Sequence, residues 1–272
     1  MINNTMNTET SPDCEIVPLS DGLLLRLTRP AKLNAITKPT LLSLQACLDR
    51  LENPNQDQAK QKILIITAAG SKAFCAGTDL AETASMTMAE RETKTIMARD
   101  LLVRLSRSRV ISVAAINGLA FGGGMELAMA CTFRVAADHA TFSLPEIKLG
   151  LLPAYGGTQF LPPLVGKARA LEMMLTGKVI DAAEARDIGL VNRLAPADAL
   201  LDAAEALTRE VTRFSPLAIQ AIRDCVTAAA GDVSDEGLKA EDQAVRKVFT
   251  SEDAQEGIAA FLEKRPAVFK GL

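Results

Sequence analysis

The chain has few of the side chains that build metal or nucleophilic sites. Its 272 residues include a single histidine, His139, and five widely spaced cysteines without a CxxC pair. Such a set cannot assemble a usual zinc site and is typical of reduced thiols in a cytosolic protein. A Ser-His-Asp triad would need His139, but no G-x-S-x-G motif accompanies it. We therefore expect no metal site, and a turn position for His139.

Long apolar runs and a strong charge of one sign are also missing. No run approaches the ~20 apolar residues of a membrane span, and the polar segment 1–13 lacks the apolar region of a signal peptide. The formal net charge of -3 provides no basic surface for nucleic acid. These features predict a cytoplasmic protein that binds neither nucleic acid nor membrane, with a flexible tail over 1–13.

The first two thirds of the chain alternate between strand and helix patterns. Two β-rich segments flank Ser20-Asp21-Gly22, which predicts a hairpin over 16–28. Short apolar, β-branched runs predict buried strands, at 63–67, 110–116, 132–136 and 141–144. Apolar residues at helical spacing predict helices, at 39–51, 88–105 and 122–131. The alternation predicts an α/β core, which we place at 14–195.

Strand signals nearly vanish after about residue 182. Four helices are predicted there, at 197–212, 216–230, 234–248 and 252–263. Ser215 and Ser251 stand where N-caps are favoured. This helical region, 196–272, is small and apolar, so we expect it to pack on the core or on a neighbouring subunit.

Two segments contain small residues that would let a ligand approach the backbone. Lys72–Leu80 includes Ala76 and Gly77, although an ordinary loop with Asp79 as a helix cap is the simpler interpretation. Gly122-Gly123-Gly124 opens a helix, whose unpaired N–H groups could hold a carbonyl oxygen or a phosphate. No lysine follows these glycines, so the segment is not a Walker P-loop, and its spacing is not GxGxxG.

Two glutamates lie in apolar surroundings. Glu126 falls in the first turn of the glycine-led helix, where it either complements the helix dipole or has a function. Glu146 follows a proline at the end of a strand, where a surface turn is the alternative. Together they could form a general acid–base pair, because desolvation and like charge would keep one of them protonated. Addition of water to a double bond requires such a pair.

These segments, in this order and spacing, resemble the crotonase superfamily, the enoyl-CoA hydratase/isomerase family. The resemblance begins at Arg29–Ala35, continues through Leu175–Gly177 and Ala185–Val191, and ends at Phe261–Phe269. It implies an α/β fold, a crotonase-type spiral of ββα repeats with a helical C-terminal region for oligomerisation. It also implies homotrimers or homohexamers built from two trimers, and a role in fatty acid or related acyl-CoA degradation.

The resemblance further implies the site residues. The N–H groups of Ala76 and Gly123 would form an oxyanion hole, Glu126 would activate water, and Glu146 would exchange a proton with the α-carbon. The thioester substrate and its coenzyme A would contact a larger set: Lys32, Leu33, Ala35, Ala73, Ala76, Gly77, Thr78, Asp79, Leu80, Gly123, Ala154, Tyr155, Lys264 and Phe269. The last two would complete the adenine end from an adjacent subunit. No cofactor is implied, since coenzyme A is part of the substrate.

The presence of both glutamates favours an enoyl-CoA hydratase. The alternatives are a Δ3-Δ2-enoyl-CoA isomerase that relies on Glu146 alone, an acyl-CoA hydrolase on the same scaffold, and a binding protein, since some relatives bind RNA. The sequence departs from the family pattern at Ala81, Ala154, Tyr155 and Phe160. Tyr155 replaces a small residue and would narrow the acyl pocket or reach into it. These departures concern the acyl group more than the reaction.

Overall fold

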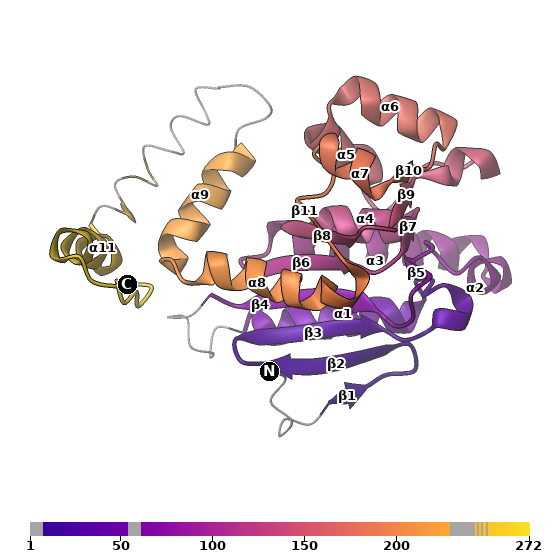
Figure 1. Ribbon diagram of the computed structural model, residues 1–272. Helices are drawn as coiled ribbons and strands as arrows, with labels where there is room; N and C mark the ends of the chain where they lie inside the picture. Colours follow the sequence, from indigo (N-terminus) through magenta and orange to yellow (C-terminus); the bar gives the residue numbers. More distant parts are fainter. Residues whose placement is uncertain (1–7, 54–60, 229–242, 244, 246, 249) are drawn as a thin grey trace. The chain divides into compact units, whose positions relative to one another are not determined.

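The structure is a computed structural model that describes residues 8–53, 61–228, 243, 245, 247–248 and 250–272 (Figure 1). It divides into two compact units, one containing Lys62–Glu205 with the preceding chain up to Asn53, the other mainly Ala206–Leu272. The helix predicted at 234–248 lies largely outside the described residues. No helix in the described part is long and apolar enough to cross a membrane.

A seven-stranded sheet is the framework of the first unit. Its order is β1 (Glu9–Thr10), β2 (Cys14–Leu19), β3 (Gly22–Leu27), β4 (Ile63–Ala68), β6 (Ile111–Ile116), β8 (Phe133–Ala137) and β11 (Arg193–Ala195). The pairs from β3 to β11 are parallel, and every residue of β4 and β6 is buried. The predicted hairpin and buried strands are confirmed, since a parallel sheet covered on both faces needs continuous apolar runs.

Two strands of this sheet were not predicted. In β1, Glu9 and Thr10 pair with β2, so part of the segment that we expected to be flexible belongs to the sheet. In β11, three residues pair in parallel with β8 after the point where strand signals fade.

A second sheet has four short strands, most of which come, along the chain, between a strand of the large sheet and a helix. It contains β10 (Ile180–Asp181), β9 (Thr141–Ser143), β7 (Leu119–Phe121) and β5 (Ala73–Cys75). Each of β5, β7 and β9 follows a strand of the large sheet, and a helix follows each in turn. This repetition is the spiral of ββα turns that the resemblance implied. It aligns the three short parallel strands, so the segments that follow them lie next to one another.

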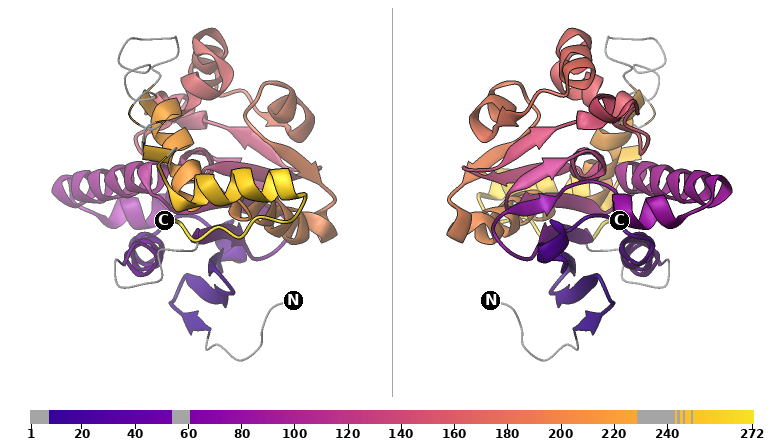
Figure 2. Two further views of the ribbon diagram at one scale, coloured as in Figure 1. Left: turned by 90° about the vertical axis from the view of Figure 1, so that its left-hand side faces the viewer. Right: turned by 90° about the vertical axis from the view of Figure 1, so that its right-hand side faces the viewer.

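Helices α1 (Lys38–Leu51) and α3 (Met88–Arg107) agree with the predicted ranges. Capping boxes at Thr37 and Thr87 begin them. Figure 2 shows α3 as a long helix seen side-on in both views. The first unit also contains the shorter helices α2 (Leu80–Ser85), α4 (Gly123–Ala130), α5 (Gly157–Val165), α6 (Lys167–Thr176) and α7 (Ala182–Asp187). Helix α8 (Leu200–Thr212) spans the boundary between the units.

The second unit contains α9 (Pro216–Ala228) and α11 (Glu252–Glu263). The predicted caps are confirmed, because Oγ of Ser215 accepts the N–H of Ala218 and Oγ of Ser251 accepts the N–H of Ala254.

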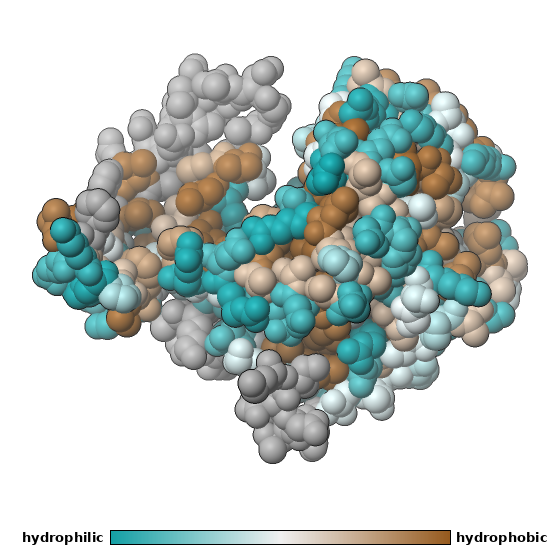
Figure 3. Space-filling model, viewed as in Figure 1, coloured by the Kyte–Doolittle hydropathy of each residue, from teal (hydrophilic) through white to brown (hydrophobic). Residues whose placement is uncertain are grey.

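The C-terminal segment runs back along α11 (Figure 2). It is tied there by Asp253, which is 2% exposed and accepts the N–H groups of Lys270 and Gly271 at 2.6 and 3.0 Å. On α9, Ile222 and Val226 are exposed. Figure 3 shows apolar, brown atoms over this helix.

Candidate active site

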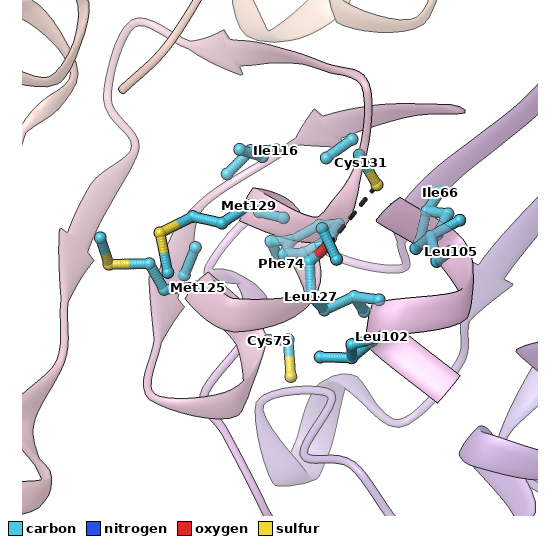
Figure 4. Close-up of a cluster of buried hydrophobic side chains, with 14 of the residues drawn as sticks. Ile66, Phe74, Cys75, Leu102, Leu105, Ile116, Met125, Leu127, Met129 and Cys131 are labelled. Atoms are coloured by element: carbon cyan, nitrogen blue, oxygen red, sulfur yellow. Dashed lines mark hydrogen bonds between the residues drawn. The ribbon is translucent and has the colours of Figure 1, made fainter. Parts of the chain in front are cut away.

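Helix α4 (Gly123–Ala130) is buried along its whole length. Its Met125, Leu127 and Met129 side chains belong to the apolar cluster that includes Phe74 and Leu102 (Figure 4). An apolar helix of this kind would be expected to carry no charge, yet Glu126 lies on it with 2% of its surface exposed.

The N-terminal turn of α4 lies directly on strand β5. A Cβ atom at Gly124 would be 2.2 Å from the carbonyl oxygen of Cys75, a distance that no side chain tolerates. Glycine at this position therefore allows the helix backbone to contact the strand backbone. This contact holds the first N–H groups of α4 beside the loop that follows β5.

Two backbone N–H groups hold the Glu126 carboxyl. Its Oε1 accepts hydrogen bonds from Tyr155 at 2.8 Å and Gly157 at 2.7 Å. The pKa of Glu126 is raised to about 7. Burial is the main cause and the charge of Glu146 adds to it, whereas the hydrogen bonds from Gly157 and Tyr155 lower the pKa. A carboxyl group that titrates near neutral pH is suited to accept and release protons.

Glu146 lies on a 3-10 turn, η2 (Pro145–Leu149), directly after β9. Desolvation raises its pKa above the ordinary value for glutamate. Its Oε1 is 2.9 Å from the point that a Cβ on Gly122 would occupy, so a side chain at Gly122 would displace this carboxyl group. Its Oε2 is buried and has no hydrogen-bond partner in the described part of the chain. An unpartnered buried oxygen favours the neutral, protonated group.

The two glutamates therefore differ in their hydrogen bonds. Two N–H groups donate to Glu126, but burial outweighs them and raises its pKa to about 7. Oε2 of Glu146 has no donor in the described part of the chain, and burial raises its pKa as well. Their charges are close enough to affect each other, so the pair is best described as sharing one proton. Desolvation and like charge, the two effects predicted from the sequence, both act on this pair.

The backbone donors differ in one respect from the expectation. The N–H of Ala76 donates to the carbonyl of Leu33 at 3.0 Å, so it is already engaged. The described residues offer no acceptor for the N–H groups of Thr78 and Gly123. Gly77, with φ of 107°, brings the chain so close that a Cβ there would lie 3.4 Å from the nitrogen of Gly123. The N–H of Thr78, and not that of Ala76, is therefore free to act as the second oxyanion donor beside Gly123.

The loop around η1 (Pro30–Lys32) lies alongside this donor loop. Besides the bond from Ala76 to Leu33, the N–H of Ile36 donates to the carbonyl of Gly77 at 2.8 Å, and Nδ2 of Asn34 donates to the carbonyl of Ala73 at 2.8 Å. The structure thus brings the predicted contacts at 32–35 together with those at 73–80.

Other predicted site residues have different surroundings. Asp79 caps α2 by accepting the N–H groups of Ala81 and Glu82, and Arg29 also binds it at 2.9 Å. These bonds lower the pKa of Asp79, the Glu82 N–H most, and they confirm its interpretation as a helix cap. Ala154 is exposed beside Tyr155. Lys264 and Phe269 belong to the second unit and are not placed relative to the glutamates.

A polar network that the sequence analysis missed adjoins the donor loop. Oγ1 of Thr78 accepts hydrogen bonds from the Tyr155 hydroxyl at 3.0 Å and from Nζ of Lys94 at 3.1 Å. Lys94 is 6% exposed and forms an ion pair with Glu82. One signal could have identified Lys94: it precedes Ala98 by four residues, which places it on the buried stripe of α3.

His139 is exposed in the turn after β8, as expected. Among the residues that the structure describes, no three His, Cys, Asp or Glu side chains are grouped to hold a metal ion.

The chain is similar to known proteins over most of its length. The model of the enoyl-CoA hydratase/isomerase family matches residues 22–272. A probable enoyl-CoA hydratase of Mycobacterium tuberculosis is 39% identical over 246 residues, which cover 90% of this chain and 93% of the relative. The crotonyl-CoA hydratase of Syntrophomonas wolfei is 36% identical over 246 residues, with the same shares covered.

A solved structure shows the same architecture. The crystal structure of an enoyl-CoA hydratase from Bacillus anthracis superposes with a TM-score of 0.89 at 33% identity. The superposition covers 96% of this chain and 100% of that one.

Proposed function

This chain belongs to the enoyl-CoA hydratase/isomerase family, and from that premise we propose that it catalyses the reversible hydration of 2-enoyl-CoA to 3-hydroxyacyl-CoA. The observation that carries the proposal is the pair of glutamates, Glu126 buried and Glu146 half-buried, whose pKa values are both raised by burial. Glu126 accepts two N–H groups, which also stabilise its base form, and Glu146 has an oxygen without a donor, which suits its acid form. Hydration requires a base that takes a proton from the water adding to the β-carbon, and an acid that gives a proton to the adjacent α-carbon.

The thioester carbonyl oxygen would accept hydrogen bonds from the N–H groups of Gly123 and Thr78. As water adds, charge moves onto this oxygen and the thioester becomes an enolate. Donors that are already in place stabilise this charge without reorganising, and one such donor is typically worth ~3 kcal/mol in the transition state. The contact between α4 and β5 supplies the rigidity that this requires.

The protons follow from the two glutamates. The Glu126 carboxylate takes a proton from water while the water oxygen bonds to the β-carbon, and the electrons of the double bond move toward the carbonyl. The Glu146 acid then gives its proton to the α-carbon. One water is added in total, and the pair is reset when the proton gained at Glu126 is exchanged back to Glu146.

The remaining expectations form part of the same proposal. Coenzyme A would lie along the loops at 32–35 and 73–80, and no further cofactor is needed because both protons come from water and the two carboxyl groups. Trimers or hexamers and a role in fatty acid degradation rest on the family alone, and a cytoplasmic location rests on the composition of the sequence.

The test follows the loss of enoyl-thioester absorbance with crotonyl-CoA. Wild type should hydrate it, and Glu126→Gln and Glu146→Gln should each lower kcat by about 10² to 10⁴. The matched control is Glu172→Gln, the same substitution at an exposed position on α6, which should retain activity. Full activity in either site variant would refute the assigned roles.

Two product assays separate the alternatives. An isomerase would shift the double bond of a 3-enoyl-CoA and would keep this activity in Glu126→Gln. A hydrolase would release the free thiol of coenzyme A, which a thiol reagent detects, without forming 3-hydroxyacyl-CoA.

A further inference from the structure

Two hydroxyl groups meet beside the backbone donors of the site. The Tyr155 hydroxyl donates to Oγ1 of Thr78 at 3.0 Å, and Nζ of Lys94 donates to the same oxygen at 3.1 Å. The tyrosine ring lies over Gly123, where an added Cβ would lie 3.0 Å from two ring carbons. Because Gly123 and Thr78 provide the two backbone donors, this pair of hydroxyl groups borders the position of the thioester oxygen.

The hydrogen bonds at Thr78 leave its hydroxyl proton unpaired. A hydroxyl oxygen has two lone pairs, and Tyr155 and Lys94 occupy both of them. The proton of Thr78 therefore points in a third direction, and it is donated to no group in the part of the chain that the structure describes. Thr78 is only partly buried, so a ligand can reach it. With its backbone N–H, this residue has two donors that lack an acceptor.

Lys94 fixes the orientation of this hydroxyl. Besides Thr78, its Nζ donates to the carbonyl of Ile36 at 3.4 Å and pairs with Glu82. These bonds use the three N–H donors of the ammonium group, which is 6% exposed as part of Lys94 and has no lone pair to accept a proton. Burial raises the pKa of Tyr155, so the phenol keeps the proton that it donates to Thr78.

The lone pairs of the substrate oxygen decide when a further donor has an effect. The carbonyl oxygen of a thioester has two lone pairs, which the N–H groups of Gly123 and Thr78 would fill. The oxygen of the enolate has a third. A third donor at this point would therefore strengthen binding mainly as charge develops, which lowers the barrier without tightening the binding of the ground state.

We propose that the hydroxyl of Thr78 is a catalytic group, the third hydrogen-bond donor to the enolate oxygen formed from the thioester. The nitrogen and Oγ1 of one threonine are separated by two carbon atoms, so an oxygen that accepts its N–H lies within reach of its hydroxyl. The inference rests on the proposed hydratase function and adds a residue to the same site.

The experiment compares Thr78→Val, which has nearly the same shape without the hydroxyl, with Thr78→Ser, which keeps it. Both variants retain the backbone N–H. Thr78→Val should lower kcat for crotonyl-CoA by about 10- to 100-fold, whereas calorimetric binding of butyryl-CoA, which has no double bond, should change by less than about threefold. Thr78→Ser and Tyr155→Phe both keep a hydroxyl at 78 and should retain kcat within about threefold.

Acetoacetyl-CoA gives a readout that does not need turnover, because its acidic α-carbon forms an enolate with its own ultraviolet absorbance. At a pH at which the ligand bound to wild type is partly enolised, Thr78→Val should lower the ratio of bound enolate to bound ketone by about 10-fold or more, and Thr78→Ser should restore it.

The outcomes separate this inference from the hydratase function. Wild-type hydration with an unchanged kcat and an unchanged enolate ratio in Thr78→Val would overturn the inference and leave the function standing. The inference would also be overturned by a loss in Thr78→Ser or Tyr155→Phe as large as that in Thr78→Val, or by an equal loss in butyryl-CoA binding. No hydration by wild type, with a lower enolate ratio in Thr78→Val, would overturn the function and support the third donor. No hydration and equal enolate ratios would overturn both.

Discussion

Replacing Glu126 with glutamine should make the fold more stable at alkaline pH, although it removes a catalytic group. The pKa of Glu126 is about 7 in the folded protein, against 4.5 for an ordinary glutamate. The folded state thus binds this proton more tightly than the unfolded chain. Its contribution to stability is complete below the unfolded pKa and is lost as pH rises through the folded pKa. The difference in pKa corresponds to about 3 kcal/mol.

Glutamine is neutral at every pH, and its Oε1 can still accept the N–H groups of Tyr155 and Gly157. The stability gained by the variant over wild type should therefore grow by about 2–3 kcal/mol between about pH 5 and about pH 8.5. Urea unfolding at both pH values and one protein concentration measures this difference, in which the titrating groups that do not interact with Glu126 cancel.

Glu172→Gln, on an exposed face of α6, is the matched control and should change stability by less than about 0.5 kcal/mol at either pH. If the difference in free energy of unfolding between Glu126→Gln and wild type stays constant or decreases with rising pH, Glu126 is not a carboxyl group whose pKa is raised by burial.

Two further predictions concern packing. Gly124→Ala would place a Cβ 2.2 Å from the carbonyl oxygen of Cys75 and should destabilise the protein by about 3 kcal/mol or more, measured by thermal unfolding. The control is Gly257→Ala, whose Cβ would lie 3.4 Å from the nearest atom, a ring carbon of Phe269. This substitution should change stability by no more than about 1 kcal/mol. A thiol reagent should modify Cys225 first, because it is only half-buried, and rapid labelling of further thiols in the native protein would contradict the model of the core. Burial raises the pKa of the other thiols, that of Cys14 to about 11 and those of Cys47, Cys75 and Cys131 to about 12.

The elements predicted well from the sequence were those with a long pattern. The continuous apolar runs of β4 and β6 and the stripes of α1 and α3 each extend over enough residues to reveal their period. Strands such as β5 have three residues, which is too short for any period, and their position depends on pairing with neighbours far along the chain. In the second sheet, β9 was predicted from its own residues, at 141–144, whereas the repetition to which the other strands belong was implied by the resemblance.

In the candidate site, too, some residues were predicted from the sequence and others were missed. Glu126 and Glu146 were found because a carboxylate among apolar residues is conspicuous in any sequence. The donor at Thr78 was missed because a loop of small residues does not reveal which N–H points outward; that depends on the left-handed backbone at Gly77 and on the bond between Ala76 and Leu33. Lys94 was missed because its partners lie on other elements.

The backbone contact between Gly124 and Cys75 also limits the paths along which this protein can evolve. Substitutions at this contact would separate the two donor segments, so most are closed to selection whatever the substrate. The side chains of Tyr155 and Thr78 meet through their hydroxyl groups, and the backbone N–H groups beneath them do not depend on what those side chains are. A lineage could therefore change these two side chains while the backbone donors beside them stay in place.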